Sequence, residues 1–232
     1  MRLDKFIAQT TEFSRSDVKR LIKIGAITVN SANASSGAQK IAPESDTVIF
    51  DGTQLKLPSP RYYMLNKPLN TVCANQDNLY PTVIDLLTTE KKADLQIAGR
   101  LDKDTTGLVL VTDDGQWNHR VTTPKSDCFK TYQATLERPL KSELINCFEQ
   151  GVQLHNEKKK TRPAKLIIID DYHAELSIQE GKYHQVRRMF AAAGNHVLTL
   201  HRSSIGPIKL DSSLTPGEYR ALTHEEVHSF AN

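Results

Sequence analysis

Residues 99–108 read GRLDKDTTGL, a segment in which charged and hydroxyl side chains stand between two glycines. The apolar run at residues 108–112 follows at once and predicts a buried strand. A second charged segment, GKYHQVRRMF at residues 181–190, leads into a predicted helix whose apolar side is Val186, Met189 and Phe190. Taken alone, each segment is explained equally well as an exposed charged surface and as part of an active site.

Composition places the chain among ordinary globular proteins. It has 232 residues, of which 38% are hydrophobic and 25% are charged, and its mean hydropathy is −0.45. That length suits two domains. The two prolines in Leu57-Pro58-Ser59-Pro60 favour a stiff, extended backbone. We therefore expect a small domain over residues 1–57, a linker at residues 58–60, and a larger domain over residues 61–232.

The net charge of +3 comes entirely from the first thirty residues. They hold six basic and three acidic side chains, whereas the remaining 202 residues hold 24 of each. In a predicted helix capped by Ser14 and Asp17, the cations Arg15, Lys19 and Lys23 stand four residues apart and so share one face. The row indicates a polyanionic partner such as nucleic acid, although on an isolated helix a solvated charged face is the commoner explanation.

Periodicity predicts the other elements as a mixture of strands and helices. Strands are expected at residues 27–29, 46–50, 62–65, 108–112, 131–136, 166–169 and 174–178, and further helices at residues 3–7, 82–87, 116–121, 142–150 and 185–193.

Motifs for cofactors, metals and membranes are missing. The phosphate-binding patterns GxGxxG and GxxxxGK do not occur, and Cys73, Cys128 and Cys147 are never spaced as CxxC. No run of about 18 apolar residues could span a bilayer, and the N-terminus lacks the apolar stretch of a secretory signal. A cytoplasmic protein without a membrane partner is therefore expected.

Residues 224–228, HEEVH, match the zinc-protease pattern HExxH. No third ligand follows before Asn232, and Thr223 with Glu226 explains the segment as a capped, exposed helix. No metal site is expected here.

The charged segments and the motifs around them resemble the RsuA-type pseudouridine synthases, whose signature loop reads GRLDxD(T/S)xGL. Further matches are Met64-Leu65-Asn66-Lys67-Pro68, Asp113-Asp114-Gly115, Lys130-Thr131-Tyr132, residues 181–189 and Leu200-His201-Arg202. Residues 2–6, 14–16 and 25–30 resemble an S4-like RNA-binding domain. The resemblance implies an α+β fold, with a small N-terminal S4-like (alpha-L) RNA-binding domain and a catalytic domain built on a mixed, mainly antiparallel sheet. Asn70 and Phe13 depart from the family, which usually has glycine at both positions.

By resemblance, Asp102 is the nucleophile that isomerises uridine to pseudouridine without a cofactor. Tyr132 would stack on the base and transfer a proton, and Arg187 would orient Asp102 through paired hydrogen bonds. Arg100 is the expected brace for the gap that a flipped uridine leaves in its stack. RNA contacts are expected from Lys182, His184, Gln185, Arg188, Arg15, Lys19 and Lys23.

Residues 110–117 and 151–157 resemble the family member that acts on small-subunit ribosomal RNA. This implies a monomeric enzyme for one uridine of 16S ribosomal RNA, within a small-subunit assembly intermediate. Two alternatives stay open: a uridine isomerase for large-subunit ribosomal RNA or tRNA, and a non-catalytic RNA-binding ribosome-assembly factor. The joint presence of Asp102, Tyr132 and Arg187 argues against the second alternative.

Overall fold

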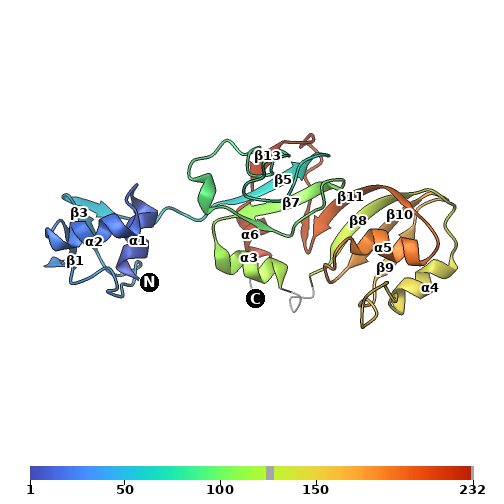
Figure 1. Ribbon diagram of the computed structural model, residues 1–232, viewed down its shortest axis with the longest axis horizontal. Coiled ribbons are helices and arrows are strands. Elements are labelled where there is room, and N and C mark those ends of the chain that lie inside the picture. The colour runs from blue at the N-terminus through green and yellow to red at the C-terminus, as the bar shows by residue number, and fades with distance from the viewer. Residues whose placement is uncertain (124–127, 231–232) are drawn as a thin grey trace. The chain divides into compact units, whose positions relative to one another are not determined.

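The structure is a computed structural model that describes residues 1–123 and 128–230. It divides into two compact units, Met1–Ser59 and Pro60–Asn232, and each is described by itself. In Figure 1 a segment without helix or strand connects them.

The first unit packs two helices on a small antiparallel sheet (Figure 1). Its elements are α1 (Leu3–Thr10), α2 (Arg15–Lys23), β1 (Ile27–Val29), β2 (Ala32–Asn33), β3 (Val48–Phe50) and β4 (Thr53–Leu55), with strand order β2-β1-β3-β4. The predicted capping box of Ser14 and Asp17 begins α2. Val18 of α2 is fully buried, whereas the row Arg15, Lys19 and Lys23 is exposed.

Phe13 has a structural explanation in this unit. Its ring meets Phe50 of β3 edge to face, with 5.4 Å between the ring centroids. The Phe13 side chain therefore packs the α1–α2 turn onto the sheet.

The second unit is built on a nine-stranded sheet (Figure 1). Its main strand order is β13-β5-β7-β11-β8-β10-β9, with β6 also paired to β7 and β12 to β11. The strands are β5 (Tyr62–Lys67), β6 (Gln96–Ala98), β7 (Thr106–Thr112), β8 (Lys130–Leu136), β9 (Lys165–Ile168), β10 (His173–Ile178), β11 (Val197–Ile205), β12 (Ile208–Lys209) and β13 (Tyr219–Ala221). Between the described strands only β7 and β11 pair in parallel, which confirms the mixed, mainly antiparallel sheet.

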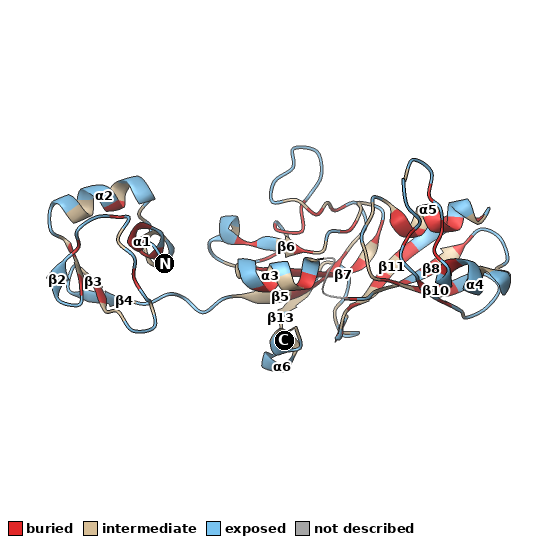
Figure 2. Ribbon diagram, turned by 90° about the horizontal axis from the view of Figure 1, so that it is seen from below, coloured by how far each residue is buried: buried red, intermediate tan, exposed pale blue. Residues whose placement is uncertain are grey.

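Helices of the second unit cover parts of this sheet, and buried residues lie where they pack on it (Figure 2). These helices are α3 (Gly115–Thr122), α4 (Glu143–Glu149) and α5 (Gln185–Ala192). The unit also contains η1 (Lys92–Asp94) and α6 (His224–His228), which have no buried residues. Val186, Met189 and Phe190 form the buried side of α5, as predicted, and Phe190 packs on Phe148 of α4 with ring centroids 5.1 Å apart. This core holds α5 against the sheet, where the helix contacts β11.

The parallel pairing of β7 with β11 places Gly107 opposite Arg202. Gly107 has φ +102°, and a Cβ atom there would lie 2.3 Å from the carbonyl oxygen of Arg202. Only glycine allows this approach. Gly107, the second glycine of GRLDKDTTGL, therefore lets the charged loop pack directly against β11, a strand that comes much later in the sequence.

The predicted helix at residues 82–87 is wrong. Thr82 and Asp85 bond each other's backbone amides, and the chain forms two turns, closed by Asp85 N to Thr82 O and Leu87 N to Ile84 O. The same reciprocal bonds begin α2 and α6, but a segment of six residues is too short to form a stable helix without further support. Asn70 adopts a left-handed backbone, with φ +61°, which asparagine tolerates better than most residues other than glycine.

Helix α6 is exposed and begins with the predicted capping box of Thr223 and Glu226. Across residues 1–123 and 128–230, no group of three or more His, Cys, Asp or Glu side chains is arranged to hold a metal ion. Within the same residues, no helix is long and apolar enough to cross a membrane.

Candidate active site

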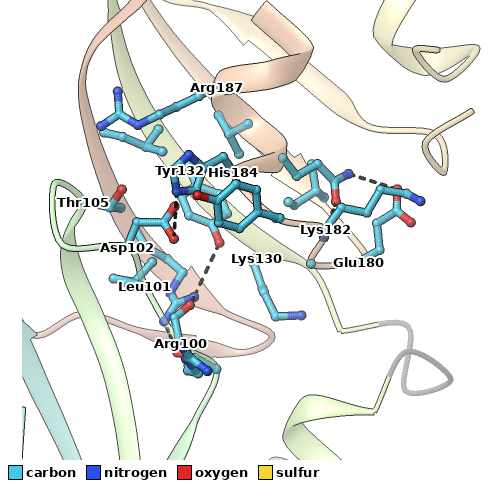
Figure 3. Close-up of a pocket in the computed structure, with 18 of the residues that line it drawn as sticks. Arg100, Leu101, Asp102, Thr105, Lys130, Tyr132, Glu180, Lys182, His184 and Arg187 are labelled. Atoms are coloured by element: carbon cyan, nitrogen blue, oxygen red, sulfur yellow. Dashed lines mark hydrogen bonds and ion pairs between the residues drawn. The ribbon is translucent and has the colours of Figure 1, made fainter. Parts of the chain in front are cut away.

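A cavity of about 580 Å³ opens in the second unit between the signature loop (residues 99–108), β8, β11 and the start of α5 (Figure 3). Its volume suits a small ligand of nucleotide size. Most of the predicted site residues of this unit line it, namely Arg100, Asp102, Tyr132, Lys182, His184, Gln185 and Arg187. Segments far apart in the sequence therefore meet at one place.

Asp102 presents its carboxylate to this cavity (Figure 3). The side chain is 39% exposed, and its Oδ1 lies 3.5 Å from Nε2 of His184. The backbone turn that holds it is closed by a bond from the amide of Thr105 to the carbonyl of Asp102. The carboxylate thus keeps hydrogen-bonding capacity for a ligand.

Arg202 of β11 supports the signature loop from beneath, although it is only 1% exposed. Its Nε donates to the carbonyl of Leu108 at 2.8 Å, its Nη2 to that of Gly99 at 2.6 Å, and its Nη1 to that of Arg100 at 3.3 Å. A buried guanidinium must find such acceptors, and here backbone carbonyls supply them. The positive charge consequently lies directly behind the loop that carries Asp102.

A second buried cation, Lys67 of β5, holds the other side of the loop. Its Nζ donates to the carbonyls of Thr105 at 2.8 Å, Pro68 at 3.0 Å and Lys103 at 3.4 Å. Burial lowers the pKa of Lys67, while the nearby charges of Asp104 and Asp102 act in the opposite direction. Lys67 and Arg202 together fix the backbone on both sides of Asp102.

Tyr132 lies opposite Arg202 across the β8–β11 pairing and is 8% exposed. Its hydroxyl oxygen accepts a bond from Arg202 Nη1 at 3.4 Å, and the guanidinium carbon lies 5.9 Å from its ring centroid. Since the arginine is only a donor, the proton of the Tyr132 hydroxyl is left for another acceptor. Sequence reasoning assigned no role to Arg202, and its only signal was membership of the motif Leu200-His201-Arg202.

Arg187 does not pair with Asp102 in this structure, contrary to expectation. Its Nη2 lies 3.0 Å from Oδ2 of Asp104 and also bonds the Asp104 carbonyl at 3.1 Å, while Nη1 donates to the carbonyl of Val197 at 2.9 Å. One terminal nitrogen therefore binds Asp104, two residues beyond Asp102, and the other binds β11 at Val197. The expected orienting contact is replaced by one to the far side of the same loop.

Lys182 and Arg188, two expected RNA contacts, both bind Glu157. Its carboxylate oxygens lie 2.8 Å from Lys182 Nζ and 3.2 Å from Arg188 Nη1, and Arg188 also donates to the carbonyl of His155. The two cations lower the pKa of Glu157, chiefly through their side-chain hydrogen bonds. Sequence reasoning did not identify this carboxylate as a site residue.

Gln185 is buried, and its amide is used inside the protein. It donates to Glu180 at 2.9 Å and accepts from the backbone amide of Lys182 at 2.9 Å. These bonds support the turn before α5, and the expected contact of Gln185 with RNA stays a prediction.

Two further cations stand at the cavity. Arg100 is exposed where two cavities adjoin, and Lys130 of β8 extends along the wall (Figure 3). Burial lowers the pKa of Lys130, and the charge of Arg202 adds to this effect. The cavity wall is therefore rich in positive charge, which suits a polyanionic ligand.

Comparison with known proteins agrees with this geometry. The family model described as RNA pseudouridylate synthase matches residues 61–192. Proteins named ribosomal small subunit pseudouridine synthase A, from Yersinia pestis and Escherichia coli K12, are each 52% identical to this chain over 230 residues. That match covers 99% of this chain and 97% and 99% of the two relatives, respectively.

A solved structure described as a pseudouridylate synthase is also similar, with a TM-score of 0.73 and 46% identity over the full length of both chains. The family match and the full-length similarity together show that this chain is an enzyme and belongs to the RNA pseudouridylate synthase family.

Proposed function

We propose that this enzyme isomerises one uridine of 16S ribosomal RNA to pseudouridine, with Asp102 as nucleophile and no cofactor. The observation that carries the proposal is the Asp102 carboxylate, which faces a cavity of nucleotide size. The substrate is proposed from the relatives of 52% identity, which are named for the small ribosomal subunit.

The reaction breaks the bond between N1 of uracil and C1′ of the ribose and forms a bond between C5 and C1′. C5 loses its proton, N1 gains one, and the sum of atoms and electrons is unchanged. The reaction therefore needs a nucleophile and proton transfer but no external oxidant, reductant or phosphate donor. An ionised carboxylate can act as this nucleophile and offset positive charge on the sugar during cleavage.

Tyr132 is proposed to stack on the uracil and to move the proton between ring positions. The bond from Arg202 supports this role, because it occupies a lone pair of the tyrosine oxygen and leaves the hydroxyl proton for the ligand. Arg187 is proposed to act on Asp102 through the loop, since it binds Asp104 from the opposite side.

The uridine must leave its stack to reach Asp102, and Arg100, at the rim of the cavity, is the proposed brace for the gap. His184, Lys182 and Arg188 are proposed to position the RNA around it. The first unit is proposed as an S4-like RNA-binding domain whose exposed row of Arg15, Lys19 and Lys23 adds affinity through counterion release. The substrate proposed is a small-subunit assembly intermediate, bound in the cytoplasm by a monomer.

The test is to map pseudouridines in ribosomal RNA from cells with and without this protein. One 16S site should disappear, and it should return with the wild-type protein and with Asp171→Asn, a change to an exposed carboxylate outside the cavity. Asp102→Asn should not restore it, although it should bind the RNA within a few-fold of wild type. A lost site in large-subunit RNA or tRNA would overturn the substrate, and turnover by Asp102→Asn would overturn the nucleophile.

A further inference from the structure

We propose that Tyr183 and His184 form a stacking platform for an unpaired base of the substrate RNA, and that this base belongs to the nucleotide next to the target uridine. The proposal rests on the RNA isomerisation proposed above. It assigns a recognition role to a side chain for which the chemistry itself has no use.

Tyr183 holds an aromatic ring in solvent at the cavity. It is 76% exposed, whereas no other Phe, Tyr or Trp of the described residues exceeds 44%. Single exposed apolar side chains are common and need no ligand. Tyr183 differs from such side chains because its ring is stacked on a neighbouring ring and because it lies at the cavity.

The ring is stacked on its neighbour. The centroids of Tyr183 and His184 are 3.9 Å apart and the planes differ by 17°. The backbone below them is fixed as well, because Arg188 Nη1 donates to the Tyr183 carbonyl at 3.1 Å and His184 has the uncommon φ of +48°. One face of the tyrosine is thus covered by imidazole, and the ring loses less freedom when a ligand covers the other face.

The platform lies beside the reacting group. Both residues line the cavity, and Nε2 of His184 is 3.5 Å from Oδ1 of Asp102 (Figure 3). His184 therefore contacts both Asp102 and Tyr183. A uridine placed at Asp102 leaves the outer face of Tyr183 to a neighbouring nucleotide.

A nucleobase is the occupant that fits this surface. Flipping the uridine removes a stacking partner from its neighbours, and an aromatic side chain can replace that partner. The nearby cations Lys182 and Arg188 suit the phosphates that join such a base to the target. Every base has a π-face, so the platform should accept any of the four with modest preference.

The experiment uses the full-length enzyme and a 16S fragment that carries 2-aminopurine on either side of the target uridine, read by stopped flow before turnover. Wild type should quench the probe on one side. Tyr183→Ala should abolish the quenching and weaken RNA binding by about 5- to 150-fold, the range known for base–aromatic stacking. The loss should fall mainly on the dissociation constant and less on the rate at saturating RNA. Tyr183→Trp should restore both quenching and affinity.

Tyr172→Ala is the matched control, because Tyr172 is an exposed tyrosine in the β9–β10 turn, outside the cavity. It should change neither signal. Quenching that survives in Tyr183→Ala, or affinity that Tyr183→Trp fails to restore, would overturn the platform. Failure of the wild type to isomerise the fragment would instead overturn the proposed function.

Discussion

Arg202 donates a hydrogen bond to the hydroxyl oxygen of Tyr132 at 3.4 Å, and the same guanidinium holds the carbonyls of Gly99 and Arg100. One buried side chain thus connects the tyrosine of the cavity wall with the backbone that precedes Asp102.

Arg202→Lys should lower the single-turnover rate by about 5- to 150-fold, since lysine keeps the charge but leaves buried acceptors unpaired, at a cost of about 1–3 kcal/mol. If Arg202 acts through Tyr132, the double variant with Tyr132→Phe should lose less than the product of the two single losses. Arg220→Lys, at an ion pair outside the cavity, is the control. If the rate losses of the two single variants simply multiply in the double variant, and the melting temperature falls in parallel, Arg202 has only a structural role.

Arg187→Lys should slow the reaction by about tenfold or more while RNA binding is retained, because a single ammonium cannot reach both Asp104 and the Val197 carbonyl. Asp104→Asn should slow it through the same contact, so the two changes together should cost little more than Arg187→Lys alone. Arg188→Lys should chiefly weaken RNA binding. Loss of catalysis in Arg188→Lys with full activity in Arg187→Lys would reverse the assignment of the two arginines.

Glu157→Gln should release Lys182 and Arg188 from their shared carboxylate. Binding to non-cognate RNA should tighten, and the slope of log affinity against log salt should steepen by about 0.7 for each phosphate newly contacted. Glu149→Gln, which changes an exposed acid of α4, is the control. An unchanged slope would show that Glu157 does not compete with RNA phosphates.

Replacing Arg15, Lys19 and Lys23 together by glutamine should weaken RNA binding and flatten its salt dependence by about 0.7 per lost phosphate contact. The expected control is the pair Lys40→Gln and Lys56→Gln, which removes exposed charges of the first unit outside α2. Equal slopes for the triple variant and the wild type would mean that the row on α2 only keeps the protein in solution.

The acid stability of the second unit should depend on Arg220, which binds Asp211 at 2.7 Å and Glu226 at 2.8 Å. Hydrogen bonds from Ser213 and Arg220 lower the pKa of Asp211 to about 2, and Arg220 also lowers that of Glu226. A depressed carboxyl pKa stabilises the fold above the ordinary pKa, and the contribution is lost as pH falls toward 2. Arg220→Gln should therefore unfold more easily at pH 7, and denaturant titrations should show the difference shrinking between pH 4 and pH 2.

Local pattern predicted much of the second unit. Strands β5, β7, β8, β9 and β10 were recognisable because apolar side chains recur on their buried faces, and α5 because Val186, Met189 and Phe190 recur at helical spacing. The residues that gather at the cavity came from the resemblance, since spacing alone could not distinguish the signature loop from a solvated turn.

Long-range pairing accounts for what the pattern missed. Strand β11 contains His201 and the buried charge of Arg202, so its sequence lacks the apolar alternation of a core strand. The position of β11 in the sheet is set by its parallel pairing with β7 at Gly107. A short stretch of sequence around β11 contains no sign of this pairing. The partners of Arg187 could not be predicted for the same reason, because Asp104 and the Val197 carbonyl come near this side chain only in the folded protein.

Lys67 and Arg202 bind the signature loop only through main-chain oxygen atoms. The backbone of the loop is therefore held by partners outside it, whereas the side chain of Lys103 has a contact of its own, with Nζ 4.1 Å from the ring centroid of Tyr80. A substitution of Lys103 would remove this cation–π contact and leave the hydrogen bonds from Lys67 and Arg202 to the loop backbone in place.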